Sequence, residues 1–373
     1  MNRISALTSI RFFMMMLIVF SHFEFLQRYN ESNIIYNLFF KNSYFAVDFF
    51  FIMSGYGMML SYTRKKNTFP NISLKNCGIF AISHVKKIYK LYLATMLIYL
   101  PLQCFFDIKV NGLSLVPLVL LEIKKIILCI PLLQSATGIH AYSHAFNSVS
   151  WFLSSLFCIY LVSPIALKFL AKIKKTSTYT IILFLNFFIL FEAHIYLKKI
   201  EITTFFDDLV YSSPYCRFLY VTIGMILAKL FLSSNTKLSN IIGTKTECFI
   251  CFISLIFIVS KNSIATFFPT MAFYNVFISI IIICLLCFIF SFQNGFISKL
   301  LQSEKLVTLG NISMYIFLIH YPIREYIDAL IRFSGFKDYH FFGLVNAVIT
   351  IVITFLISFK IYKVKAHYDS NKK

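Results

Sequence analysis

Two residues in the first apolar stretch of the chain, Arg11 and His22, are of types that can do chemistry. They are eleven positions apart, so in an α-helix they lie within about 20° of the same face and about 16 Å apart along the axis. A guanidinium binds phosphate with two parallel hydrogen bonds, and an imidazole can take a proton from a hydroxyl near neutral pH. This spacing predicts a phosphate contact and a general base on one face. The alternative is an arginine that reaches lipid head groups and a histidine bonded to a neighbouring helix.

Asp48 is an acid inside the next apolar stretch, where it precedes three phenylalanines. A charge at this depth costs several kcal/mol, so the carboxylate must be neutralised or paired, and Arg11 or His22 could serve as its partner. An aspartate bonded to His22 would hold the tautomer of the imidazole. A structural ion pair between helices explains Asp48 equally well. Ser54, followed by Gly55, could mark a packing notch or a bend beside a ligand.

Further polar and aromatic residues lie at or near the ends of later apolar stretches. They are Ser150, Trp151, Arg217 and His320. A lone tryptophan at a membrane boundary is usually an interfacial anchor. Two Cys-x-x-Cys pairs, which begin at Cys248 and Cys284, have metal-like spacing. We assign them to packing because both lie in apolar helices, and we expect no metal.

The elements that carry these residues must be membrane helices. The 373 residues are 59% hydrophobic and only 13% charged, with a mean hydropathy of +0.78, which excludes a soluble enzyme, a disordered chain and a disulfide scaffold. The sequence predicts an all-α polytopic membrane protein with about ten transmembrane helices in one bundle. The predicted segments are 6–25, 43–61, 88–106, 149–168, 178–197, 213–232, 247–261, 271–292, 306–324 and 341–361. An eleventh run, 113–133, is interrupted by Glu122, Lys124 and Lys125, and we interpret it as re-entrant or interfacial.

The net charge of +20 serves orientation rather than nucleic-acid binding, because the basic residues fall mainly between apolar runs. Lysines and arginines cluster within 64–90, 168–175 and 360–373. These three regions lie on one side if ten helices span, and the positive-inside rule then places both termini in the cytoplasm. We predict one domain, residues 1–363, followed by a short basic cytoplasmic tail, 364–373.

Six segments, in this order, resemble the motifs of the acyltransferase 3 family of membrane-bound acyltransferases, which are often sugar O-acetyltransferases. The segments cover nearly the whole chain. They are Arg11-x10-His22, Tyr44 to Tyr56, Lys87-Ile-Tyr-Lys-Leu-Tyr92, Trp151-Phe-Leu-Ser154, Arg217 to Gly224, and Ser313 to Pro322. The third segment has Lys87 where the family has arginine and Lys90 where proline is usual. Leu156 stands where many members have glutamate.

The resemblance implies transfer of an acyl group, most simply acetyl from acetyl-CoA, to a hydroxyl of a cell-surface glycan or its lipid-linked precursor. In this scheme His22 is the base and Asp48 orients it, while Arg11, Lys87 and Lys90 hold the donor phosphates. Contacts with the substrate come from Ser54, Ser150, Trp151, Arg217 and His320. The resemblance also implies a bacterial cytoplasmic (inner) membrane, with membrane lipids and polysaccharide-assembly proteins as partners.

Two other classes of protein compete with this interpretation. A polymerase of lipid-linked oligosaccharide would usually show an outer loop dense in arginine, whereas residues 107–148 contain only Lys109, Lys124 and Lys125 as Lys or Arg. A transporter would be expected to show paired half-repeats and broken helices, which we do not find. A third alternative, suggested by Leu156, is an acyltransferase-like protein that has lost activity.

Overall fold

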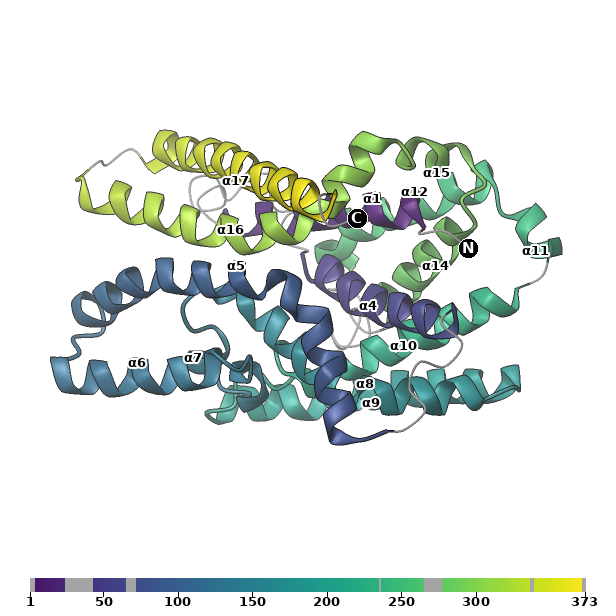
Figure 1. The fold of residues 1–373 in the computed structure, drawn as a ribbon, viewed down its shortest axis with the longest axis horizontal. Coiled ribbons are helices and arrows are strands. Elements are labelled where there is room, and N and C mark those ends of the chain that lie inside the picture. Colours follow the sequence, from purple (N-terminus) through teal and green to yellow (C-terminus); the bar gives the residue numbers. More distant parts are fainter. Residues whose placement is uncertain are drawn as a thin grey trace.

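The computed structural model describes residues 4–23, 43–64, 72–234, 236–264, 277–335 and 339–370. This part of the chain contains helices and connecting segments but no strand, which confirms the all-α prediction (Figure 1). The helices are α1 (Ser5–Ser21), α4 (Tyr44–Arg64), α5 (Leu74–Lys109), α6 (Leu115–Cys129), α7 (His140–Ser143), α8 (Trp151–Lys172), α9 (Thr176–Thr203), α10 (Pro214–Ser233), α11 (Thr236–Ile241), α12 (Thr244–Ile264), α14 (Ser279–Phe292), α15 (Phe296–Leu301), α16 (Glu304–Phe333) and α17 (Tyr339–Ser370).

Each of the ten predicted segments coincides with one of these helices, although parts of 6–25 and 271–292 lie outside the described residues. Seven described helices are long and apolar enough to cross a membrane: α4, α5, α8 with the turn before it, α9, α10, α16 and α17. Two shorter apolar helices, α1 and α14, add to them. The count of about ten spans and the side on which the termini lie stay predictions.

The interrupted run 113–133 forms α6, which has 15 residues, fewer than the roughly 20 that a spanning helix needs. This length agrees with our interpretation of the run as a segment that does not cross the membrane. Its charges are partly buried against the end of α5. Lys125 Nζ lies 3.0 Å from Asp107 Oδ2 and 2.6 Å from Glu122 Oε1, so each buried charge has a partner.

Glycines allow two helix pairs in the core to approach until their backbones touch. A Cβ added to Gly224 of α10 would lie 1.9 Å from the carbonyl oxygen of Ile52 in α4, and one added to Gly55 of α4 would lie 1.9 Å from that of Val221 in α10. The predicted notch at Gly55 is therefore half of a reciprocal contact between α4 and α10. Gly310 brings α16 equally close to α1.

The last helix passes through the predicted domain boundary without a break. α17 extends from Tyr339 to Ser370, so residues 364–370 continue the helix that precedes them. Lys365 also contacts the bundle, because its Nζ donates a hydrogen bond of 3.2 Å to the hydroxyl of Tyr315 on α16. α16 and α17 lie side by side (Figure 1).

Candidate active site

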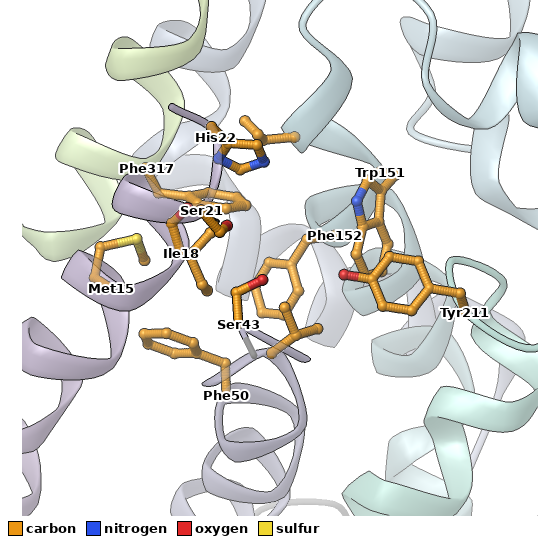
Figure 2. A pocket seen from close by; sticks show the side chains of 12 residues that line it. Met15, Ile18, Ser21, His22, Ser43, Phe50, Trp151, Phe152, Tyr211 and Phe317 are labelled. Atoms are coloured by element: carbon orange, nitrogen blue, oxygen red, sulfur yellow. Dashed lines mark hydrogen bonds between the residues drawn. The ribbon is translucent and has the colours of Figure 1, made fainter. Parts of the chain in front are cut away.

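A cavity of about 40 Å³ lies between α1, α4, α8, α16 and the segment that precedes α10. Its lining is mostly apolar and aromatic, with a few polar groups. Figure 2 shows His22 on one side of the cavity, with Trp151 and Tyr211 together on the other. The lining residues are Met15, Ile18, Ser21, His22, Ser43, Val47, Phe50, Val149, Trp151, Phe152, Tyr211 and Phe317. Of these side chains, only His22 is a base with an ordinary pKa near neutrality.

His22 caps the C-terminal end of α1 and pairs with His320 of α16. The Nδ1 atom of His22 lies 3.0 Å from Nε2 of His320, and Nδ1 of His320 lies 3.1 Å from the carbonyl oxygen of Ile316. A carbonyl can only accept, so His320 donates from Nδ1 and accepts at Nε2 when neutral. His22 must then donate from Nδ1, and its Nε2 carries the lone pair. The contact therefore selects the His22 tautomer whose Nε2 can accept a proton.

Arg324 fixes the backbone of the same residue. Its Nη1 donates to the carbonyl oxygen of His22, and its guanidinium carbon lies 5.1 Å from the ring centre of Tyr321. A cation beside the terminal carbonyls of a helix satisfies a group that has no partner within the helix. Both the backbone and the ring of His22 are thus held by α16.

The structure corrects the expected partner of Asp48. Asp48 forms a buried ion pair with Arg217, with 2.6 Å between Oδ1 and Nη1, whereas the ring of His22 is held by His320. The reason is the close contact between α4 and α10, which places Asp48 and Arg217 at one interface. This is the structural ion pair between helices that the sequence left open as one explanation of Asp48.

Arg217 in turn supports the aromatic wall of the cavity. Its Nε donates a 2.6 Å hydrogen bond to the carbonyl oxygen of Tyr211. The guanidinium carbon lies 5.0 Å from the ring centre of Tyr211 and 5.9 Å from that of Trp151. The two rings are themselves 4.9 Å apart. Arg217 is only 3% exposed, so it positions this wall from behind.

The remaining predicted residues do not line the cavity. Arg11 donates a 2.7 Å hydrogen bond to the carbonyl oxygen of Gly310, and the Ser54 hydroxyl donates to the Phe50 carbonyl within its own helix, at 2.8 Å. Ser150 is buried at the start of α8. Lys87 and Lys90 are exposed on α5. The structure therefore brings His22 and Trp151 to one cavity, with His320 in contact with His22 and Arg217 behind the aromatic wall.

Sequence reasoning missed Tyr211 and Arg324. Arg324 lies four residues after His320 on the same helix face, and this spacing could have indicated it. Tyr211 belongs to the turn before α10, where no periodicity operates, so nothing in the sequence placed it beside Trp151. Leu156, at the position of the family glutamate, is buried in the apolar core.

A family model described as an acyltransferase domain, acyltransferase 3, matches residues 4–363. That range contains every residue of the site. No curated protein and no solved structure matches the chain.

Proposed function

The chain belongs to the acyltransferase 3 family and has several helices apolar enough to span a membrane, and on this basis we propose that it is a membrane O-acyltransferase. The group it transfers is an acyl group, with acetyl as the first choice, and the donor is acyl-CoA. The acceptor is a hydroxyl of a cell-surface glycan or its lipid-linked precursor. The observation that carries this proposal is the His22 imidazole, which faces the cavity with its tautomer set by His320.

The proposed reaction needs little beyond alignment and one base, because a thioester is already activated. Nε2 of His22 takes the proton of the acceptor hydroxyl as its oxygen attacks the thioester carbonyl. The carbon–sulfur bond then breaks, and the imidazolium returns the proton to the departing CoA thiolate. Trp151, Tyr211 and Ser43 line the cavity, and their N–H and O–H groups are able to donate to the oxyanion.

The aromatic wall supports a sugar acceptor. Trp151 and Tyr211 present apolar ring faces beside polar N–H and O–H groups, which suits a sugar ring with its C–H faces and hydroxyl edges. The cavity of about 40 Å³ is room for roughly three water molecules at about 10–15 Å³ each. It therefore admits the reacting ends of donor and acceptor, while the rest of each molecule must lie outside it.

For the donor phosphates we propose Arg11, Lys87 and Lys90, which the structure places outside the cavity. Lys87 and Lys90 are exposed on α5, where they can meet a soluble anion. If they bind the CoA phosphates, Lys87→Ala with Lys90→Ala should raise the KM for acyl-CoA and leave kcat unchanged. We place the protein in a bacterial inner membrane with both termini cytoplasmic, alongside polysaccharide-assembly proteins.

The test is a mass spectrum of the host's surface polysaccharide before and after mild base. Strains that carry the wild-type chain, a deletion or His22→Ala are compared at equal membrane levels. We expect a base-labile acyl mass to disappear in the deletion and the variant, because loss of a general base lowers a rate by about 10²–10⁴-fold. His194→Ala is the control, since it removes a histidine of another helix that lies outside the cavity lining and whose Nδ1 contacts the carbonyl oxygen of Leu190 at 2.7 Å.

Other outcomes contradict the proposal. Unchanged ester content with an altered chain length or lost export would favour the polymerase or transporter instead. Purified wild-type chain that neither transfers nor hydrolyses labelled acetyl-CoA, while the deletion strain keeps all its esters, would point to a protein without acyltransferase activity.

A further inference from the structure

Outside the site described above, two histidines converge on one carboxylate oxygen. His140 Nδ1 and His144 Nε2 each lie 3.1 Å from Asp208 Oδ2. His140 is the first residue of α7, and His144 directly follows its last residue. Asp208 lies 68 positions after His140, in the turn before α10. A backbone hydrogen bond of 3.1 Å from Asp208 to Gly138 holds the two segments together. The cluster joins two segments that are far apart in the sequence, and no linear motif revealed it.

We propose that His140, His144 and Asp208 bind one divalent transition-metal ion of the zinc class. Two imidazoles and one carboxylate are a donor set that such ions prefer, and a fourth position remains for water. With bonds of about 2.0–2.2 Å, tetrahedral geometry puts donor atoms about 3.3–3.5 Å apart. The histidine nitrogens lie at 3.1 Å from the carboxylate oxygen, and all three donor atoms lie within 4.8 Å of one another. A small movement of the exposed His140 ring would complete the geometry.

The groups around the cluster favour an ion over an accidental meeting of side chains. Nδ1 of His144 lies 2.9 Å from the hydroxyl of Ser148, which is the kind of outer contact that fixes the ring of a metal-binding histidine. Asp208 is buried, and one of its carboxylate oxygens faces both imidazole rings. His140 has 60% of its side chain exposed, so an ion can enter from the solvent side.

The ion would anchor the aromatic wall of the cavity. The ring of His144 lies 6.2 Å from that of Trp151, and Tyr211 follows Asp208 by three residues in the same turn. One ion would therefore tie the segment before Trp151 to the segment that carries Tyr211. In this role the cluster is a positioning element and touches no reacting atom. Binding of the ion does not depend on the function proposed above.

The test uses the purified full chain in detergent, stripped of metal with a chelator and titrated with Co²⁺ alone, then competed with Zn²⁺. We expect visible absorption that saturates at one ion per chain and is lost when Zn²⁺ is added. His144→Ala and Asp208→Asn should each weaken binding by at least tenfold, as even loss of an outer-shell partner costs about 10–100-fold. His84→Ala, on α5 and outside the cluster, should bind as the wild type does.

His140→Gln covers the case in which the variants at His144 and Asp208 do not fold, because the His140 side chain is the most exposed of the three. A wild-type chain that binds no Co²⁺, or binding that survives all three substitutions, would overturn the proposal. The proposal would also be overturned if the substitutions lowered the melting temperature of the metal-stripped chain while Zn²⁺ did not raise the melting temperature of the wild type. That pattern would identify a cluster held by hydrogen bonds alone. Metal binding is read without any acyl transfer, so its failure is separate from failure of the proposed function.

Discussion

Nδ1 of His22, at the end of α1, lies 3.0 Å from Nε2 of His320 on α16, although the two residues are 298 positions apart in the chain. His320 is fully buried and holds the carbonyl of Ile316 at 3.1 Å with its other nitrogen. This arrangement makes His320 a positioning residue for the base. His320, late in the chain, thus orients His22, which lies near the beginning.

Replacing His320 tests this relationship directly. His320→Phe should lower kcat by at least tenfold with little change in KM, because His22 loses the acceptor that selects its tautomer; in the serine protease triad, loss of the orienting group costs about 10⁴-fold. His320→Gln should retain part of the activity, since its amide oxygen can accept from His22 Nδ1. Acyl transfer by purified variants gives both constants. Equal activity of the Phe and wild-type chains would contradict the role.

The buried pair of Asp48 and Arg217 should stabilise the bundle as a unit. Arg217→Ala or Asp48→Ala should each reduce the free energy of unfolding by about 3–5 kcal/mol, because each leaves one buried charge unpaired. The double variant should lose much less than the sum of the two. Thermal or denaturant unfolding in detergent measures all three. Arg332→Ala, which removes a more exposed pair with Asp328, should cost about 0–1 kcal/mol. Strict additivity would show that the two residues act independently.

The close contact of α4 and α10 should not tolerate a side chain at Gly224. In Gly224→Ala the new Cβ would lie 1.9 Å from the Ile52 carbonyl oxygen, so the helices must separate, at a cost of about 1–3 kcal/mol or more. Gly57→Ala is the matched control on α4, since an added Cβ there meets nothing within 4 Å. It should be neutral or stabilise by up to about 1 kcal/mol through helix propensity. Similar melting temperatures for the two variants would show that the contact gives way easily.

Two adjacent lysines of α6 should differ sharply. Lys125 is buried between Asp107 and Glu122, whereas Lys124 is exposed. Lys125→Met leaves the two carboxylates without their cation and should reduce the free energy of unfolding by about 3–5 kcal/mol. Lys124→Met should change it by less than about 0.5 kcal/mol. Protease sensitivity around α6 and the melting temperature report the difference. Equal behaviour of the two variants would show that the ion pairs of Lys125 do not stabilise the protein.

The sequence alone determined the class of the protein and the position of nearly every element. Apolar runs of about 20 residues permit little other than membrane helices, and all ten predicted segments carry a helix in the structure. The ordered motifs also indicated the family, whose model matches residues 4–363. They also selected His22 and Trp151, which line the cavity, and His320, which contacts His22.

Only the tertiary structure decided which of these side chains meet. Helical periodicity places a residue on a face but says nothing about the helix opposite, and that depends on how closely backbones can approach. Gly224 and Gly55 join α4 to α10, so Asp48 pairs with Arg217, while Gly310 joins α16 to α1, so His22 pairs with His320. Tyr211 and Asp208 lie in an irregular turn, where the sequence has no period to read. Tyr211 lies beside Trp151, and Asp208 lies beside His140 and His144, through chain packing alone.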